Sequence, residues 1–447
     1  MALKITVIGT GYLGATHAAA MAELGYEVLG LDVVPEKIEM LQRGEVPMYE
    51  PGLEELLRKH VAGIEGSTGR LRFTMDWAEV AEFGDVHFMC TNTPQKHGEY
   101  ACDMSYVDRA FELLAPHLTR PALVVGKSTV PVGSADRLAA YLAAHAPAGE
   151  DAELAWNPEF LREGFAVEDT LHPDRIVVGV RSERAERLLR EVYAGPVADG
   201  SPFVVTDFPT AELVKTAANS FLATKISFIN AMAEVCEAAD GDVVKLAEAI
   251  GHDERIGKKF LRAGIGFGGG CLPKDIRAFM ARAGELGADQ ALTFLREIDS
   301  INMRRRGQMV EMTREALGGG SFLGKRVAVL GATFKPDSDD VRDSPALNVA
   351  GQIHLQGGQV TVYDPKGMAN ARRLFPTLGY ADTAVEAVRG ADVVLHLTEW
   401  REFRDLDPAS LGDAVRARVV LDGRNALDPA LWRKAGWTFR AMGRPTA

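Results

Sequence analysis

The chain has 447 residues, of which 47% are hydrophobic and 25% charged, and its formal net charge at pH 7 is −12. This length exceeds what one hydrophobic core accommodates, so we expect roughly three domains in a protein of ordinary globular composition. The acidic balance argues against nucleic acid or an anionic membrane as the main partner, although a local group of Lys and Arg side chains can still bind a phosphate-bearing substrate.

The start of the chain and its apolar segments bear on its location. A first strand is expected at 4–8, which leaves no room for a signal peptide, and no stretch is apolar for long enough to cross a bilayer. We therefore expect a cytoplasmic protein. The ten histidines show no HExxH pattern and no pair of the four cysteines has CxxC spacing, so the sequence predicts neither a metal site nor a disulfide framework.

Short apolar runs alternate with helical stretches in the first half of the chain, a pattern typical of a parallel α/β sheet. The pattern changes near 207–209. Residues 210–239 contain neither Gly nor Pro, which predicts one long helix, and helical character continues to about residue 306 with an interruption at the glycine cluster 264–270. The expected strands of the first half are 4–8, 27–32, 86–91, 123–127 and 176–180.

The first pattern returns after the run Gly-Gly-Gly-Ser at 318–321, which we interpret as part of a linker. Three apolar runs there match three earlier ones in the same order: 326–331 with 4–9, 360–365 with 28–32, and 391–398 with 84–91. The sequence therefore predicts an α/β fold of two Rossmann-like domains with parallel sheets, joined by a central helical domain that contains one long helix. The expected boundaries are 1–208, 209–306, a linker at 307–320, and 321–447.

A dinucleotide-binding pattern, G-x-G-x-x-G, follows the first expected strand as Gly9, Gly11 and Gly14. Alone this pattern is weak, but here it opens an Ala-rich helix and an acidic residue, Asp32, ends the next strand. The helix N-terminus favours the phosphates, and Asp32 should accept hydrogen bonds from the ribose hydroxyls, which favours NAD over NADP. The matching loop after Gly331 lacks the paired glycines, so we expect a different phosphate ligand there.

One cysteine has the surroundings of a nucleophile. Cys271 follows a glycine run that we expect to be flexible, and it precedes Pro273, a favourable first-turn residue of a helix. A helix N-terminus and a nearby lysine lower the pKa of a thiol, and the thiolate is the reactive form. The other cysteines lie in or beside apolar segments and are expected to be buried and inert: Cys90, Cys102 and Cys236.

Polar residues on the long helix share one face. Glu212, Lys215 and Asn219 project within about 60° of one another at 100° per residue. They form either a solvated stripe or the wall of a site, and their apolar flanks favour the wall of a site. Two polar segments at expected strand ends, 127–133 and 157–164, lie where an open α/β sheet binds its ligand, although each is also compatible with a capped turn.

Eight motifs in chain order resemble those of the UDP-glucose/GDP-mannose dehydrogenase family across nearly the whole length. One departure is Gly270, because many relatives have Ser before the cysteine. The motifs are Gly9-x-Gly11-x-x-Gly14, Tyr-Glu-Pro-Gly-Leu at 49–53, Thr93-Pro94, 127–133, 157–164, 266–275, Phe-Lys-Pro-Asp-Ser-Asp-Asp-Val-Arg at 334–342, and Asp-Gly-Arg-Asn at 422–425.

The resemblance implies an NAD-dependent, four-electron oxidation of UDP-glucose to UDP-glucuronate through a thiohemiacetal and a thioester on Cys271. It assigns stabilisation of the oxyanion to Lys215 with Asn219. It assigns activation of the hydrolytic water to Asp275 with Thr129, and an acid/base role to Glu159.

The resemblance also implies the residues that contact the ligands, and no metal. Substrate contacts would be Glu159, Phe160, Leu161, Glu163, Lys215, Asn219, Arg255, Arg262, Phe267, Gly268, Phe334, Lys335 and Arg424. NAD contacts would be Gly9, Gly11, Tyr12, Leu13, Gly14, Asp32, Lys37, Thr93, Thr129, Glu163, Lys274 and Arg342.

The long helix carries apolar residues around much of its surface, so we expect a homodimer through it, with Arg255 reaching the neighbouring subunit.

Within the family, the 157–164 segment distinguishes the chain from N-acetyl-hexosamine dehydrogenases, and overall likeness favours UDP-glucose over GDP-mannose. An alternative function is that of a β-hydroxyacid dehydrogenase, which transfers a single hydride. Such an enzyme needs neither Cys271 nor a second nucleotide-binding domain, so these two features argue against it. A second alternative is a regulatory protein that binds NAD without catalysis, but this function would not explain the 266–275 segment.

Overall fold

The computed structural model describes residues 3–445, and it divides the chain into two compact units. The first consists of the residues up to 218 together with 277–285, and the second consists of 219–276 together with the residues from 286 onward. Each unit contains one β-sheet; the boundaries at 218/219 and 276/277 fall inside helices, and the boundary at 285/286 falls at the end of a helix.

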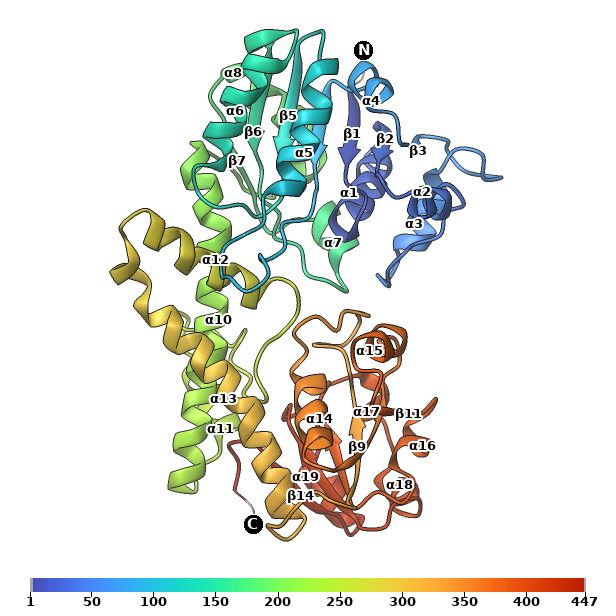
Figure 1. Cartoon of the computed structure of the whole chain (residues 1–447), viewed down its shortest axis with the longest axis vertical. Helices are drawn as coiled ribbons and strands as arrows, with labels where there is room; N and C mark the ends of the chain where they lie inside the picture. Colours follow the sequence, from blue (N-terminus) through green and yellow to red (C-terminus); the bar gives the residue numbers. More distant parts are fainter. Residues whose placement is uncertain (1–2, 446–447) are drawn as a thin grey trace. The chain divides into compact units, whose positions relative to one another are not determined.

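The first unit is built on an eight-stranded sheet of order β3-β2-β1-β4-β5-β6-β7-β8 (Figure 1). Neighbouring strands are parallel, apart from the single antiparallel pairing of β6 with β7. All five predicted strands are present within two residues of their expected bounds. The strands are β1 Lys4–Ile8, β2 Glu27–Leu31, β3 Leu71–Thr74, β4 Val86–Met89, β5 Ala122–Gly126, β6 Ala152–Trp156, β7 Ile176–Gly179 and β8 Phe203–Thr206.

Three strands of this sheet were not predicted, namely β3, β6 and β8. The strands β3 and β8 are four-residue edge strands with partly exposed side chains. Hydrophobic clusters cover both faces of the sheet: α1, α3 and α8 pack on one face, and α4, α5 and α6 pack on the other.

The helices of this part of the chain connect successive strands, as expected for a doubly wound sheet. They are α1 Tyr12–Glu23, α2 Pro35–Gln42, α3 Leu53–His60, α4 Trp77–Phe83, α5 Ser105–Leu114, α6 Ser134–His145, α7 Ala166–Leu171, α8 Glu183–Val192 and α9 Ala194–Ala198.

The predicted long helix is confirmed as α10, Phe208–Ala239, with 32 residues. It begins two residues earlier than expected because Oδ1 of Asp207 accepts a hydrogen bond from the Thr210 N–H at 2.7 Å and so caps its first turn. It ends before Asp240, whose φ of 55° is left-handed. The helices α11 Val243–Gly251, α12 Leu272–Glu285 and α13 Thr293–Ala316 follow.

The predicted linker at 307–320 is wrong over its first ten residues, because α13 continues through them to Ala316. The side chains of Met309, Val310 and Thr313 are buried along one face of this helix, and their packing extends it. The glycine run that suggested a linker only ends the helix: Gly318 and Gly319 both have positive φ.

The second unit contains a six-stranded parallel sheet of order β11-β10-β9-β12-β13-β14. This order repeats that of β3-β2-β1-β4-β5-β6, so the repeat seen in the sequence is a repeat of structure, and the prediction of two Rossmann-like domains is confirmed. The strands are β9 Arg326–Leu330, β10 Gln359–Tyr363, β11 Gly379–Tyr380, β12 Val393–His396, β13 Val419–Asp422 and β14 Thr438–Ala441.

The helices that follow α13 lie between these strands and are short, apart from α14. They are α14 Pro345–Leu355, α15 Met368–Leu374, α16 Ala384–Val388, α17 Arg401–Arg404, α18 Pro408–Gly412 and α19 Pro429–Lys434. Among the described residues, no helix is both long and apolar enough to cross a membrane.

Candidate active site

The loop between β1 and α1 has the geometry of a dinucleotide cradle. Gly9 has a φ of 87°, which favours glycine. A Cβ added at Gly14 would collide with the carbonyl oxygen of Gly9, so helix and strand approach each other closely there. At Gly11, by contrast, the nearest atom to an added Cβ is 3.8 Å away. The loop therefore leaves open space at the position where a pyrophosphate would approach the backbone.

Asp32 lies at the end of β2, and its side chain is 6% exposed. Its carboxylate accepts hydrogen bonds from the Thr10 N–H at 2.9 Å and the Val34 N–H at 3.2 Å. The Nζ of Lys37, another predicted NAD contact, is 2.7 Å from Asp32 Oδ2. The structure thus brings the predicted ribose acceptor and the predicted cation together beside the glycine loop.

The two polar segments at strand ends meet around a buried lysine. Lys127 follows β5, and its Nζ donates to Asn157 Oδ1 at 3.0 Å and to Tyr193 Oη at 3.3 Å. Burial lowers the pKa of Lys127 to about 8. A cavity of about 50 Å³ adjoins these residues, with Leu13, Glu159 and Phe160 also in its wall. Lys127 and Tyr193 were not singled out as site residues, although a lysine directly after a buried strand is an unusual signal.

Lys215 and Glu159 form an ion pair within the first unit. The Nζ of Lys215 is 2.9 Å from Glu159 Oε1, and Glu159 Oε2 accepts a hydrogen bond from the Leu161 N–H at 2.8 Å. Lys215 is buried on α10, and its charge is held next to the predicted acid/base residue. These three predicted site residues are therefore neighbours.

Glu212, Lys215 and Asn219 are all buried, so the stripe they form on α10 is not solvated. Glu212 accepts hydrogen bonds from the N–H groups of Gly133 and Ala135, both at 2.7 Å, at the N-terminus of α6. Burial, which outweighs these hydrogen bonds, raises the pKa of Glu212 to about 7. This carboxylate fixes the end of the segment that carries Thr129.

Cys271 is exposed, whereas the other three cysteines are buried as predicted. Burial raises the pKa of the Cys90 thiol to about 12, which fits an inert side chain. Cys271 directly precedes α12, and its carbonyl accepts a hydrogen bond from the Asp275 N–H at 2.9 Å. The predicted nucleophile thus occupies the N-terminus of a helix, where a thiolate is favoured.

The glycine run before Cys271 is closely packed, so the expectation of a flexible run is wrong. A Cβ added at Gly268 would collide with the carbonyl oxygen of Asp343, and one at Gly270 would collide with the guanidinium of Arg342. These glycines are needed because other segments of the second unit approach their backbone. Arg342, a predicted NAD contact, pairs with Asp340 at 2.7 Å.

Asn219 and Asp275 are brought together in the second unit. Asn219 Nδ2 donates to Asp275 Oδ2 at 2.6 Å, and the Nζ of Lys274 lies 2.7 Å from Asp275 Oδ1. Asp275 is 2% exposed, so these contacts hold its carboxylate in place. Asp275 is four residues after Cys271, one helical turn along α12.

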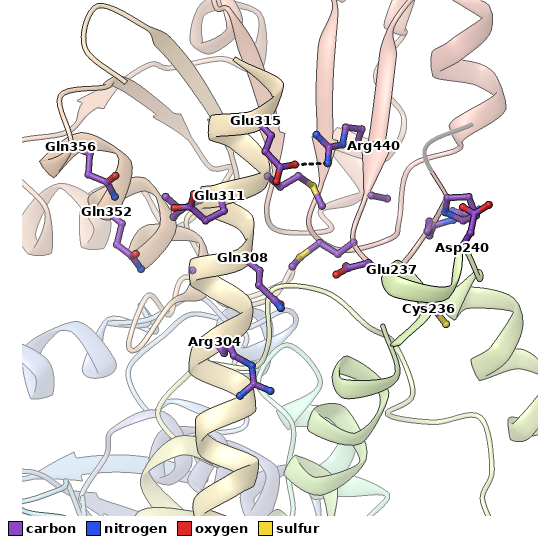
Figure 2. A pocket seen from close by; sticks show the side chains of 17 residues that line it. Cys236, Glu237, Asp240, Arg304, Gln308, Glu311, Glu315, Gln352, Gln356 and Arg440 are labelled. Carbon is purple, nitrogen blue, oxygen red and sulfur yellow. Dashed lines mark hydrogen bonds and ion pairs between the residues drawn. The ribbon is translucent and has the colours of Figure 1, made fainter. Parts of the chain in front are cut away.

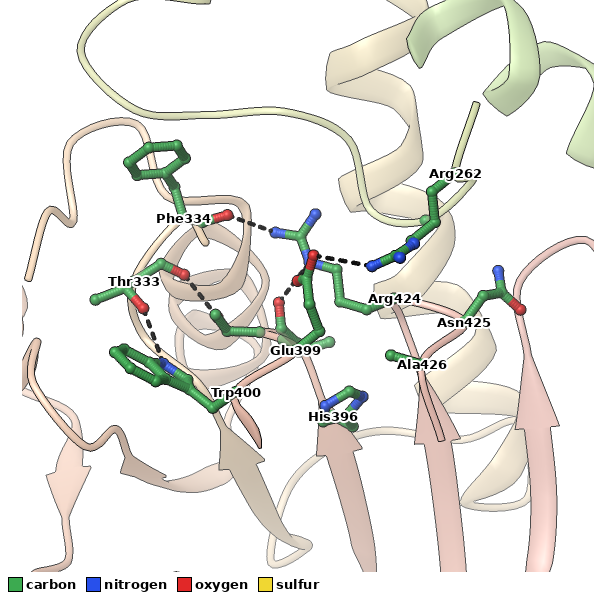
Figure 3. Close-up of polar contacts among 12 residues, drawn as sticks. Arg262, Thr333, Phe334, His396, Glu399, Trp400, Arg424, Asn425 and Ala426 are labelled. Atoms are coloured by element: carbon green, nitrogen blue, oxygen red, sulfur yellow. Dashed lines mark hydrogen bonds and ion pairs between the residues drawn. The ribbon is translucent and has the colours of Figure 1, made fainter. Parts of the chain in front are cut away.

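Arg424 is the centre of a polar network at the strand ends of the second sheet (Figure 3). Its guanidinium donates to three main-chain carbonyls: those of Leu397 at 2.8 Å, Gly266 at 2.8 Å and Phe334 at 3.1 Å. Arg424 therefore connects the loop that leads to Cys271 with the segment that carries Lys335. Glu399, which was not predicted, lies 3.6 Å from both Arg424 and Arg262.

The remaining predicted contacts differ in exposure. Arg255 is 88% exposed and pairs with Asp253 at 2.6 Å, whereas Phe267 is buried and its N–H donates to Asn302 Oδ1 at 2.7 Å. Within the described residues, no group of three or more His, Cys, Asp or Glu is placed to hold a metal ion.

A larger cavity of about 680 Å³ lies elsewhere in the second unit (Figure 2). Residues from the end of α10, from α13, from α14, and from β14 with the segment after it line this cavity, among them Glu237, Arg304, Gln352 and Arg440. No residue predicted for catalysis or binding lines this cavity.

Similarity to known proteins extends over nearly the whole chain. The models of the UDP-glucose/GDP-mannose dehydrogenase family match in order: the NAD binding domain at 3–196, the central domain at 209–304 and the UDP binding domain at 328–429. The chain is 41% identical over 445 residues to the UDP-glucose 6-dehydrogenase of Rhizobium meliloti (strain 1021), covering 99% of this chain and 100% of that one.

Two further similarities agree with this match. The UDP-glucose 6-dehydrogenase YwqF of Bacillus subtilis (strain 168) is 38% identical, covering 99% of this chain and 98% of that one. The solved structure of a UDP-glucose dehydrogenase from the archaeon Pyrobaculum islandicum has a TM-score of 0.89 and 36% identity, covering 99% of this chain and 98% of that one.

Proposed function

Because the chain belongs to the UDP-glucose/GDP-mannose dehydrogenase family, we propose that it oxidises UDP-glucose to UDP-glucuronate in an NAD-dependent, four-electron reaction. The observation that carries this proposal is the exposed Cys271 at the N-terminus of α12, one turn from Asp275. Full-length similarity to UDP-glucose 6-dehydrogenases supports the choice of substrate.

The residues of the β1–α1 loop fit NAD. The open space at Gly11 admits a pyrophosphate, and the first N–H groups of α1 point a partial positive charge toward it. The carboxylate of Asp32 accepts hydrogen bonds from ribose hydroxyls and repels a 2′-phosphate. When bound, NAD supplies the oxidant, accepting one hydride in each of the two oxidations.

The chemistry assigned to Cys271 explains how one carbon is oxidised twice. After the first oxidation the C6 alcohol has become an aldehyde, and the Cys271 thiolate adds to it to form a thiohemiacetal. Loss of a second hydride and a proton gives a thioester. Water then attacks the thioester carbon, releasing the carboxylate and the thiol. The covalent bond keeps the intermediate from diffusing away between the two oxidations.

The other proposed catalytic roles follow from charge and hydrogen bonding. The Lys215 cation, with the Asn219 amide, stabilises negative charge on the C6 oxygen. Glu159, paired with Lys215, accepts the proton of the C6 hydroxyl. Asp275 is held by Asn219 and Lys274. Together with Thr129, it activates the water that hydrolyses the thioester.

We further propose three functional parts: an NAD-binding domain at 1–208, a central dimerisation domain from 209 through the end of α13, and a UDP-sugar-binding domain at 321–447. In the last, Lys335 supplies charge for the nucleotide sugar, together with Arg262 of the central domain. The three carbonyl contacts of Arg424 support a role in fixing the loops around the ligand.

A homodimer through α10 is the proposed assembly. Phe221, Phe228 and Val235 follow one another at seven-residue intervals on α10, and they are 66%, 46% and 58% exposed. Apolar side chains at this spacing form a continuous seam along a helix, which a second copy of the helix would cover. Arg255, whose side chain extends into solvent, is proposed to reach the nucleotide sugar of the neighbouring subunit.

The reaction is tested by supplying a panel of nucleotide sugars, GDP-mannose included, and counting NADH formed per sugar consumed. Two NADH per UDP-glucose are expected from the wild type. Cys271→Ser should lose most of its activity because a serine hydroxyl ionises far less readily near neutral pH. Cys236→Ser is the matched control, which should cost stability only. Wild-type turnover with two NADH per sugar in Cys271→Ser would contradict the covalent mechanism.

The shared site is tested by mixing subunits of Arg255→Ala with subunits of Cys271→Ala and purifying the heterodimer by two tags. If Arg255 acts across the interface, one site of the heterodimer has both residues intact and the other lacks both. Activity should then reappear in about half of the sites. A confirmed heterodimer without activity would show that Arg255 does not act on its neighbour.

A further inference from the structure

Glu50 is a buried carboxylate outside the catalytic residues assigned above. It lies in the loop between α2 and α3, and its side chain is 4% exposed. Within the described residues no Lys, Arg or His pairs with it. Three hydrogen-bond donors surround it instead: the Tyr12 hydroxyl, the Gly164 N–H at 2.7 Å and the Ala166 N–H at 2.7 Å.

Two of these donors, Tyr12 and Gly164, come from the two segments that we propose to bind the two ligands, and the third, Ala166, is the first residue of α7. Tyr12 is the first residue of α1, directly after the open position at Gly11. Gly164 ends the 157–164 segment, which carries Glu159, and its N–H also donates to the Tyr12 hydroxyl at 3.0 Å. One carboxylate therefore connects the cofactor loop with the substrate segment, although more than a hundred residues separate them in the chain.

The contact is sensitive to the position of either segment. A buried carboxylate is tolerated only while its donors are in place, because an ionised group without hydrogen bonds is strongly disfavoured in the interior. Burial, followed by the hydrogen bond to Glu50, raises the pKa of Tyr12, so that this side chain stays a donor. Fixing Tyr12 thus favours the arrangement in which Glu50 also holds Gly164 and Ala166.

We infer that Glu50 is a positioning residue that couples the two binding events, so that NAD and the nucleotide sugar each increase the affinity for the other. Such coupling is reciprocal by thermodynamic necessity. The inference rests on the proposed function, since it takes both ligands from it. It adds that the cofactor loop and the substrate segment of the first unit communicate through Tyr12, Glu50 and Gly164.

The experiment measures the dissociation constant of NADH by fluorescence, once with NADH alone and once with saturating UDP-glucuronate. NADH and UDP-glucuronate are the two products, so no turnover occurs during the titration. The ratio of the two constants is the coupling factor, expected to be at least about fivefold in the wild type. Tyr12→Phe removes one donor and should bring the ratio close to one while the protein stays folded. Glu50→Gln should also do so, because its amide nitrogen cannot accept from the second N–H.

A matched control separates coupling from stability. Leu57 is fully buried in α3, near this loop in the chain, and makes no hydrogen bond to Glu50. Leu57→Ala should lower the melting temperature and keep the wild-type coupling factor. If Glu50→Gln fails to fold, Tyr12→Phe alone decides the question. The double variant should show no further loss of coupling beyond either single variant.

The outcomes also distinguish this inference from the proposed function. A wild type that binds both ligands with a coupling factor of one would overturn the inference and leave the function standing. Coupling that persists unchanged in Tyr12→Phe would overturn it as well. A wild type that binds neither NADH nor UDP-glucuronate would contradict the proposed function itself.

Discussion

The first and second sheets share the order of six strands, yet the loops that follow β1 and β9 are built differently. With β1 and β9 aligned, Gly9 corresponds to Gly331, and both have positive φ. The next positions diverge, because Gly11 corresponds to Thr333. Gly11 has open space beside it, whereas the Thr333 side chain is buried and hydrogen-bonded.

The two acidic residues that end the second strand of each sheet show the same contrast. Asp32 is 6% exposed; its Oδ2 accepts from the Thr10 N–H and hydroxyl and pairs with the partly exposed Lys37, whereas, among the described residues, its Oδ1 accepts only from the Val34 N–H. Asp364 is 1% exposed, and one of its oxygens accepts from the Ala332 and Thr333 N–H groups, the Thr333 hydroxyl and the Trp400 indole N–H. Figure 3 shows the Trp400 indole pointing to Thr333, whose hydroxyl oxygen it contacts at 3.1 Å.

The difference teaches how one scaffold serves two ligands. In the first sheet the acid at the end of the second strand remains available to a ribose, beside a glycine that admits a pyrophosphate. In the second sheet the corresponding space is filled by a threonine and a tryptophan, so the acid has become part of the structure. We therefore propose that a ligand of the second sheet binds further along the loop, toward Lys335.

The largest expected effect is that of Asp364→Ala. It leaves at least four buried donors without an acceptor, at roughly 1–3 kcal/mol each, so the free energy of unfolding should fall by about 5 kcal/mol or more. Asp32→Ala is the matched variant of the first sheet and should lose less, about 2–3 kcal/mol, because the Thr10 N–H and hydroxyl are the chief buried donors that it leaves without an acceptor, while Lys37 can turn to solvent. Urea denaturation of both variants measures this, and equal losses would remove the distinction between the two acids.

The next effect separates two glycines of one loop. Gly14→Ala places a Cβ against the carbonyl of Gly9, so we expect a loss of about 3 kcal/mol in stability. Gly11→Ala has room for its methyl group and should keep the wild-type melting temperature, but weaken NADH binding at least about tenfold. Thermal unfolding and NADH titration check the pair. A Gly11→Ala protein with normal NADH affinity would show that the cofactor does not approach there.

Much of this contrast was predictable from local pattern. The glycine spacing, the acids at 32 and 364 and the three repeated strands are visible within a few residues of sequence, as is the helix period of α10. The residues that the sequence did not reveal depend on partners far away in the chain. Glu50 accepts a hydrogen bond from the Gly164 N–H, and Glu399 lies 3.6 Å from Arg262, so the residues next to Glu50 and Glu399 in the sequence do not indicate these contacts.

The same reason explains the errors. The glycine run before Cys271 looks flexible in isolation, and only the approach of Asp343 and Arg342 makes glycine necessary there. The linker was predicted to begin too early because the glycines at 318–320, which only end α13, suggested a linker around them. The buried face that extends α13 to Ala316 is recognised only from its packing in the structure.

A smaller effect concerns the ends of the fifth strands, where the first sheet buries a cation, Lys127, and the second an anion, Asp422. Burial lowers the pKa of Lys127 from its usual 10.5 to about 8. Between these values the unfolded chain holds a proton that the folded chain has released, so stability should rise with pH. Relative to Lys127→Met, the wild type should gain about 2 kcal/mol from pH 8 to pH 10.

The control for this pH effect lies in the second sheet. Burial alone would raise the pKa of Asp422, but His396 and main-chain N–H groups lower it below its usual value. The contribution of Asp422 to stability is therefore lost only in acid. The difference in the free energy of unfolding between wild type and Asp422→Asn should be the same at pH 8 and at pH 10. A wild type that gains nothing over Lys127→Met in this window would mean that Lys127 keeps an ordinary pKa.

The smallest effect concerns the choice of cofactor. Asp32→Ala removes the acceptor for the ribose hydroxyls, so the Michaelis constant for NAD should rise about tenfold, equivalent to about 1.4 kcal/mol. It also frees Lys37, whose Nζ lies 2.7 Å from Asp32, to attract a 2′-phosphate, so the preference for NAD over NADP should narrow. In the double variant Asp32→Ala with Lys37→Met, the gain in affinity for NADP should disappear, while the Michaelis constant for NAD should remain raised. Steady-state kinetics with both cofactors decide the matter. Wild-type discrimination in Asp32→Ala would mean that Asp32, like Asp364, serves only the structure of its sheet.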